Sequence, residues 1–254
     1  STLVNGQKLT GDVSVDTNAE NPVFQGSLFL HQADVGALLP DYNISGILDG
    51  NLDFAGTMDN PSISGALTGK ELSYEGYDVK RAKAVFAYHD DKLTVSHLEA
   101  DRDGGHLEGR ASYDRLGGDF SVSLLADNIN LDGLPVNSPV TGTVSGYGLA
   151  EGNYLNGSLS LKKASASIEG TNLSYDNMAA GNLSGFGSYD GSSWQVTALG
   201  SGISYDGMSF DSLSFSAENR DGVITVPYLS GAGEEGFFTG NGYYSDNGMN
   251  FDVE

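Results

Sequence analysis

The chain has 254 residues with 34 acidic and 12 basic side chains, a net charge of −22 and no cysteine. The negative charge argues against nucleic acid and against an anionic membrane surface as partners, because both would repel the protein. Disulfides and thiolate metal sites are excluded, and no apolar run approaches the roughly 20 residues of a membrane-spanning helix.

The two ends of the sequence indicate an interior piece of a longer protein. The chain opens at Ser1-Thr2 without a methionine or a signal peptide, and Phe251 to Glu254 continue a strand pattern. We therefore expect a soluble fragment of a larger chain.

Apolar residues alternate with Ser, Thr, Asn and Asp through most of the chain, first over residues 24–30 and again over 48–56. Helical periodicity does not extend over a useful length, so the pattern predicts antiparallel strands with one apolar face and one solvated face. Candidate turns separate the strands, at residues 59–61, 89–91, 101–105, 189–191 and 219–222. The sequence predicts an all-β protein.

Two segments are exceptions to this strand pattern. Residues 33–39 are closed by Pro40, and residues 127–134 are closed by Pro135. We expect each to form a turn of helix or an ordered loop.

Residues 72–122 align without a gap on residues 203–253, at a constant spacing of 131. The shared Gly, Asp and Tyr fall where turns are needed, which indicates a duplicated supersecondary unit. Weaker similarities elsewhere give approximate repeat units at 7–71, 72–138, 139–202 and 203–254. No linker composition separates them, so we expect one continuous sheet over residues 1–254.

Several glycines fall in phase with the apolar residues, among them Gly26, Gly50 and Gly65. Glycine inside a strand packs nothing and weakens it, so this placement indicates a sharp bend or a close approach. Ordinary β-bulges are the alternative explanation.

Polar clusters in the sequence favour structural roles over catalysis. His89 and the segment 101–105 lie at predicted turns, where Asp is favoured for its own backbone hydrogen bonds. His97 and His106 are replaced by Tyr228 and Phe237 in the second copy. With no nucleophile elbow and no metal-ligand spacing, we expect no enzyme, no metal and no cofactor.

The apolar face itself must be shielded from water. Either a second sheet covers it, or the sheet curls into an open trough that receives acyl chains. The residues predicted to face the groove are Phe24, Leu28, Leu30, Leu48, Leu52, Phe54, Ile63, Leu67, Phe86, Leu93, Val95, Phe120, Val122, Leu124, Leu213, Phe215, Ile224, Val226 and Phe238.

The order of signals over residues 24–124 resembles the repeat of the TamB family, within the AsmA-like group of bacterial envelope proteins. A Pro-closed loop (38–40) precedes an Ile-x-Gly strand (44–56), an Asn-Pro turn with Ile63 and Gly65, the Leu72-Ser-Tyr74 segment with Gly76, and Gly105-His-Leu-Glu-Gly109 with Tyr113. The resemblance is looser over 139–200 and returns over 203–253.

This resemblance implies a long, mostly antiparallel sheet curled into an open β-taco with an apolar groove. It implies a segment of a bridge-like lipid transport protein in the periplasm of a diderm bacterium, with the parent chain anchored in the inner membrane. The implied partners are phospholipid acyl chains, flanking groove segments of the same parent chain and, through the parent, outer-membrane assembly proteins.

Two other functional classes compete with lipid transport. Acidity, absent cysteine and abundant Gly, Ser and Asn also fit a β-solenoid or β-sandwich stalk of a secreted adhesin, although repeats near 100 residues are long for solenoid rungs. A carbohydrate- or calcium-binding lectin is the third hypothesis, and the lack of clustered aromatic residues counts against it.

Overall fold

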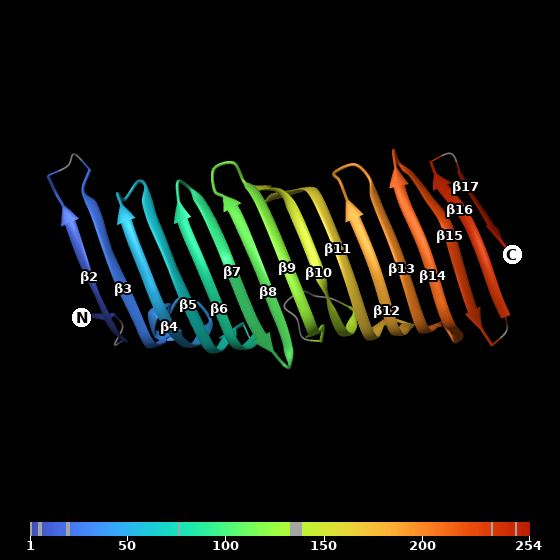
Figure 1. Cartoon of the computed structure of the whole chain (residues 1–254), viewed down its shortest axis with the longest axis horizontal. Coiled ribbons are helices and arrows are strands. Elements are labelled where there is room, and N and C mark those ends of the chain that lie inside the picture. Colours follow the sequence, from blue (N-terminus) through green and yellow to red (C-terminus); the bar gives the residue numbers. More distant parts are fainter. Residues whose placement is uncertain are drawn as a thin grey trace. The chain divides into compact units, whose positions relative to one another are not determined.

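The computed structural model describes residues 2–4, 7–18, 21–75, 77–132, 139–234, 236–246 and 248–254. The predicted all-β, antiparallel fold is confirmed, because these residues form seventeen strands and one four-residue helix (Figure 1). The elements are β1 (Thr2–Val4), β2 (Gln7–Asp16), β3 (Val23–Asp34), α1 (Val35–Leu38), β4 (Ile44–Gly56), β5 (Pro61–Tyr74), β6 (Tyr77–His89), β7 (Lys92–Arg102), β8 (Gly105–Asp114), β9 (Asp119–Asn130), β10 (Thr141–Leu155), β11 (Ser158–Tyr175), β12 (Met178–Tyr189), β13 (Trp194–Tyr205), β14 (Met208–Arg220), β15 (Val223–Gly233), β16 (Gly236–Ser245) and β17 (Gly248–Val253).

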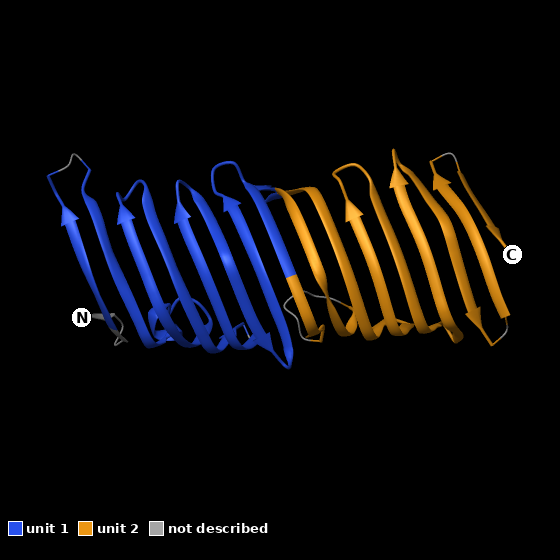
Figure 2. Ribbon diagram, viewed as in Figure 1, with its two compact units in different colours: residues 1–124, 153–158 blue, residues 125–152, 159–254 orange. Residues whose placement is uncertain are grey.

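The chain divides into two compact units (Figure 2). Unit 1 comprises residues 1–124 and 153–158, and unit 2 comprises residues 125–152 and 159–254. In unit 1, strands β1 to β8 each pair antiparallel with the next strand in the chain, and strands β11 to β17 do the same in unit 2. This antiparallel meander excludes the parallel rungs of a β-solenoid.

Short turns join the strands where the sequence predicted them. The two central residues have positive φ in several hairpins, as in Asp221 (52°) and Gly222 (81°), which is the type I′ geometry that matches strand twist. The predicted helical turn at 33–39 is present as α1, where the Asp34 carboxylate accepts hydrogen bonds from the backbone of Gly36 (2.9 Å) and Ala37 (3.3 Å).

The expectation of a helical turn or loop at 127–134 is wrong over its first half, because β9 continues through Asn130. The backbone takes a left-handed conformation at Asn128 (φ 52°), whose N–H donates to the Ser145 hydroxyl at 2.9 Å. This hydrogen bond links β9 to β10 at the left-handed residue, so the strand continues in the sheet. Residues 133–135, and Gly76 of the sequence motif, lie outside the described residues.

The spacing of 131 that relates the two sequence copies also relates their structures. The register irregularity after Val95 in β7 recurs after Val226 in β15, and the one after Val85 in β6 recurs after Ser216 in β14. The same spacing separates both bounds of β6 from those of β14, of β7 from those of β15, and of β8 from those of β16. The duplication therefore includes strand lengths and bulges.

Strands in both units bend where a residue in the left-handed region interrupts the pairing. In unit 1 these residues include Gln32 (φ 48°) and Glu71 (φ 48°), and in unit 2 they include Asn172 (φ 51°) and Gly202 (φ 58°). The predicted bend is thus present, but non-glycine residues supply much of it. Gln32 is held there by a hydrogen bond from its N–H to the Asp49 carboxylate at 2.9 Å.

Gly202 allows the cost of the left-handed backbone conformation to be measured without steric collisions. A Cβ built on it comes no closer than 3.7 Å to any atom. We expect Gly202→Val to lower the free energy of unfolding by at least about 1–2 kcal/mol, the cost of the left-handed region for a side chain with a Cβ. Gly202→Asn is the matched control and should cost less, since Asn occupies the equivalent bend in β11. Urea denaturation measures both, and equal losses would contradict a backbone origin.

Candidate functional site

The apolar face of each unit is built from rows of side chains that run across neighbouring strands. In unit 1 one such row is Leu30, Gly50, Leu67, Ala84 and Leu98. In unit 2 the corresponding kind of row is Gly170, Leu183, Gly200, Leu213, Gly231 and Phe238. Large residues thus alternate with glycine or alanine from strand to strand.

Most apolar side chains on this face remain in contact with solvent. The accessible surface is 16108 Å², whereas a compact monomer of this length exposes roughly 11,000 Å². Among the described residues, the buried apolar side chains are Leu9, Leu30, Ala33, Val35, Ile203 and Ala217. The filled interior of a β-sandwich is therefore not what the described residues form.

Neighbouring side chains lie over many of the glycines on the apolar face. A Cβ on Gly65 would come within 2.7 Å of Leu52 Cδ2, and one on Gly200 would come within 2.6 Å of Ile203 Cδ1. At Gly65 the Asn51 carbonyl oxygen would also lie 2.5 Å away, and a backbone atom cannot move aside, so glycine is needed there. At Gly200 the close atom is the terminal methyl group of Ile203, which could shift. The close approach predicted from the sequence is confirmed at Gly65.

Strand β12 differs, because its glycines are uncovered. The nearest atom to a Cβ on Gly187 would be the Gln195 carbonyl oxygen at 3.8 Å, and a Cβ on Gly185 would meet only the Thr197 carbonyl oxygen inside 3.4 Å. A groove of about 560 Å³ lies over this floor. Its lining is almost entirely apolar, from strands β11 to β14 and Val140, and includes Ala166, Ile168, Leu183, Val196, Ala198, Ile203, Leu213 and Phe215.

The strand register places the predicted groove residues of β3 to β7 and of β14 to β16 on the apolar face of their units, but their surroundings differ. Leu28 and Leu67 pack against the buried cluster of Leu9, Leu30 and Ala33, next to Leu38 of helix α1. Phe24 and Phe54 pack on each other with ring centroids 6.2 Å apart. Of the whole predicted set, Leu213 and Phe215 line the groove over β12.

Sequence reasoning missed the rest of this groove, since it named no candidate between Leu124 and Leu213. The signal was present as small residues in phase, with Ala164, Ala166 and Ile168 on one strand and Gly185 and Gly187 on the next. The prediction considered only large apolar residues, so it did not include a floor made of glycine and alanine.

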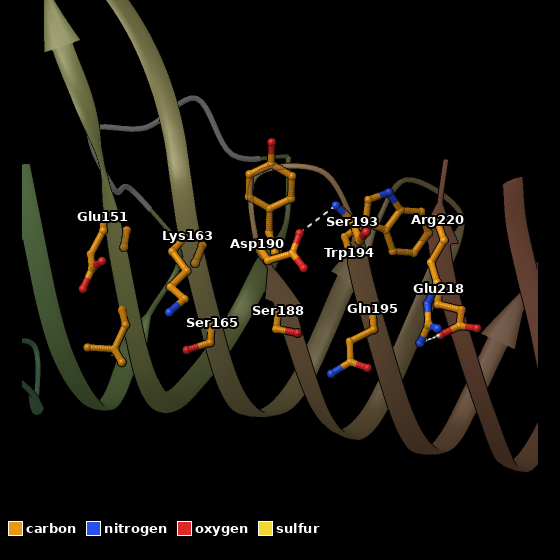
Figure 3. Close-up of a pocket in the computed structure, with 14 residues that line it drawn as sticks. Glu151, Lys163, Ser165, Ser188, Asp190, Ser193, Trp194, Gln195, Glu218 and Arg220 are labelled. Atoms are coloured by element: carbon orange, nitrogen blue, oxygen red, sulfur yellow. Dashed lines mark hydrogen bonds and ion pairs between the residues drawn. The ribbon is translucent and has the colours of Figure 1, made fainter. Parts of the chain in front are cut away.

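A second hollow, of about 580 Å³, involves polar residues of the same unit (Figure 3). Lys163, Ser165, Ser188, Gln195 and Glu218 contribute to its lining. Together with Trp194 and Tyr189 near the turn at 190–193, they give it a chemistry unlike that of the apolar groove.

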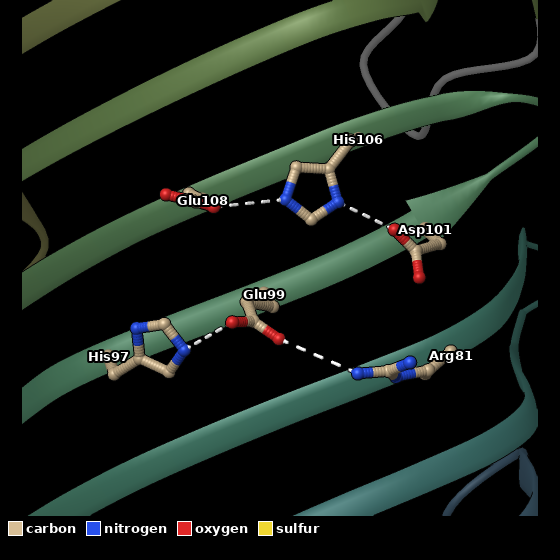
Figure 4. Close-up of polar contacts among 6 residues, drawn as sticks. All are labelled: Arg81, His97, Glu99, Asp101, His106 and Glu108. Carbon is tan, nitrogen blue, oxygen red and sulfur yellow. Dashed lines mark hydrogen bonds and ion pairs between the residues drawn. The ribbon is translucent and has the colours of Figure 1, made fainter.

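Ion pairs cross the polar face of unit 1 (Figure 4). Glu99 lies 2.6 Å from His97 Nε2 and 3.9 Å from an Arg81 nitrogen, and the His97 contact leads the interactions that lower the Glu99 pKa. His106 is held between Asp101 (2.6 Å) and Glu108 (3.3 Å), which raise its pKa.

The second copy replaces these charges with neutral groups. At the positions equivalent to His97 and Glu99, the Tyr228 hydroxyl donates to the Ser230 hydroxyl at 2.7 Å. Ser214, in place of Lys83, lies 2.9 Å from Ser230. One network is ionic and the other is neutral, so the two copies share the position of a polar contact and not its charge.

The described ranges contain no group of three or more His, Asp or Glu side chains arranged to hold a metal ion. No helix in the same ranges has the length and apolar character to span a membrane.

Neither family models, nor curated proteins, nor solved structures gave a match to this chain. Relatives therefore contribute nothing to its functional assignment, which depends on the residues and their geometry.

Covered and uncovered glycines should respond oppositely to the same substitution. We expect Gly65→Ala to lower the free energy of unfolding by about 1–3 kcal/mol, because its Cβ collides with Asn51 and Leu52. Gly187→Ala should raise it by roughly 0.5–1 kcal/mol, because open space accepts the methyl group and the unfolded chain loses freedom. Urea denaturation of both variants decides, and a loss at both positions would show that the β12 floor is also filled.

The raised pKa of His106 predicts how stability depends on pH. Protonated His106 is favoured in the folded chain by Asp101 and then Glu108, so its stabilisation is fully present below the unfolded pKa of about 6.5 and is lost as pH rises through the raised folded value. The urea midpoint should fall across that window. His106→Phe, which installs the residue of the second copy, should flatten the fall, and an unchanged profile would exclude His106 as its source.

Proposed function

We propose that this chain is a lipid-binding segment that shields acyl chains on its apolar face. The observation that carries the proposal is the groove of about 560 Å³ over the uncovered glycine floor of β12. It is lined by residues of strands β11 to β14, and the described lining offers apolar contacts without a charged side chain. Such a surface suits a hydrocarbon chain better than a polar substrate.

The energetics favour this occupant. Each CH₂ removed from water contributes roughly 0.8 kcal/mol, so a long acyl chain gains more from a groove than any single polar contact would supply. The medium-sized residues around the floor, such as Ile168 and Leu213, make shallow contacts. Shallow, similar contacts permit movement along a path, which a deep and specific pocket would prevent.

The proposal includes the finer assignment that the sequence resemblance implies, a TamB-like periplasmic segment that conducts phospholipid between the inner and outer membranes. Three features support it. They are the antiparallel meander, the Pro-closed helical turn after β3, and the repeated bends that curl the strands. Flanking segments of a parent chain would then extend the path.

The direct test is native mass spectrometry of the purified protein, followed by organic extraction of what co-purifies. We expect phospholipid at variable stoichiometry in the unmodified chain. Gly187→Leu fills the floor in open space, and should reduce retained lipid at least fivefold without loss of stability. Phe215→Asp, which puts a charge in the groove wall, should do the same.

Ser184→Leu is the matched control, since it adds the same side chain to β12 but on the opposite face. It should retain lipid like the unmodified chain. A cooperatively folded protein that carries no lipid and ignores added fluorescent phospholipid would defeat the proposal.

A further inference from the structure

The glycine floor of the acyl groove ends at a pair of aromatic side chains. Gly187 of the floor pairs with Val196 across β12 and β13. Two residues further along, Tyr189 pairs with Trp194, and these two residues flank the turn at 190–193. Both also border the polar hollow, but alternate residues of a strand point to the same face, so their rings lie on the face of the acyl groove.

This aromatic pair lies where apolar surroundings meet polar ones. The Tyr189 hydroxyl donates to the Gly191 carbonyl oxygen at 2.8 Å, so its polar end is directed at the turn. In that turn the Asp190 carboxylate accepts hydrogen bonds from the backbone N–H groups of Ser192 (3.2 Å) and Ser193 (2.8 Å) (Figure 3). Tyrosine and tryptophan combine an apolar body with a polar tip, and both are enriched where lipid tails meet head groups.

The cations of unit 2 lie at this same end of its strands. The Lys and Arg residues of the unit are Lys162, Lys163 and Arg220. Each lies within two residues, along its strand, of the row that contains the aromatic pair. Alternation places Lys162 on the groove face, because it precedes by two residues Ala164, the partner of Tyr189. An Arg220 nitrogen lies 3.0 Å from Glu218, which offsets that acidic neighbour.

The opposite end of the groove carries negative charge. Tyr175 and Met178 line the groove there and flank the turn that contains Asp176. The next turn at this end, between β13 and β14, contains Asp206, and neither turn contains Lys or Arg. A phosphate group is repelled by these carboxylates and attracted by the cations at the other end.

The length of the groove along β12 suits one acyl chain. Tyr189 and Leu183 are six positions apart in this strand, about 20 Å at roughly 3.3 Å per residue. Half of the hydrocarbon core of a bilayer, the depth that one acyl chain fills, is about 15 Å. A chain that starts at Tyr189 therefore reaches Leu183 over the uncovered glycines of the floor.

From these features we propose that the groove holds a phosphate-bearing lipid in one orientation. The head group lies beside Tyr189 and Trp194, and the acyl chain extends along β12 toward Leu183. The cations at this end attract the phosphate, while the aromatic rings pack against the part of the lipid between head group and tail. This inference rests on the function proposed above, and it adds which end of the groove receives the head group.

Trp194 reports the orientation directly, because it is the single tryptophan of the chain. The purified protein is loaded with phosphatidylcholine whose acyl chain carries a nitroxide quencher either near the head group or near the terminal methyl group, and native mass spectrometry measures the loading. We expect the quencher near the head group to reduce Trp194 fluorescence at least about threefold more, since a tenfold preference for one orientation needs only about 1.4 kcal/mol.

Two variants check the same assignment. Trp194→Phe combined with Tyr175→Trp moves the tryptophan to the opposite end of the groove, and should reverse the order of the two quenchers. Lys162→Gln combined with Lys163→Gln removes cations from the head-group end, and should bring the quenching ratio at Trp194 closer to one. Circular dichroism establishes that each variant retains the strand content of the unmodified chain.

The outcomes separate the orientation from lipid binding itself. A chain that loads neither lipid contradicts the function proposed for the groove. With lipid loaded, the orientation is overturned by equal quenching from the two lipids, by stronger quenching from the label near the methyl group, or by no quenching from either. It is also overturned if the moved tryptophan gives the same order as Trp194.

Discussion

The strand-to-strand hydrogen-bond ladder is the interaction on which this structure depends. Since few described apolar side chains are buried, the burial that dominates ordinary domains is reduced here. What remains is local, as each strand pairs with its neighbour and each large side chain covers the next strand's glycine. Stability then grows strand by strand, as in repeat proteins, and each change is felt mainly by adjacent strands.

Glycine has opposite effects depending on what lies over it. Where Leu52 covers Gly65, the pair fills the apolar face and stabilises the sheet. Where nothing covers Gly187, the same residue type leaves a hollow and costs stability. The β12 floor is therefore a place where the sheet is weaker than it needs to be, and such a cost is retained most readily where an open surface has a use.

Local signals in the sequence predicted much of the fold and less of the site. Alternation and turn residues gave the antiparallel strands and the helical turn after β3, because each depends on neighbouring residues. The bend at Gln32 was not predictable, since it depends on Asp49 in the next strand. The same limit hid the groove, because whether Gly65 or Gly187 is covered depends on the rotamer and register of another strand.

A sheet that is one layer thick can carry two kinds of chemistry on the same strands. Gly187 and Ser188 are consecutive, yet Gly187 lines the apolar groove and Ser188 lines the polar hollow. In a domain with a filled core, one of these faces would pack against another layer. Here alternate residues of each strand point to opposite faces, apolar on one and polar on the other. Each surface can therefore change with little effect on the other. The duplicated copies illustrate that independence, since His97 and Glu99 on the polar face correspond to Tyr228 and Ser230, while the strand lengths and bulges of the two copies are the same.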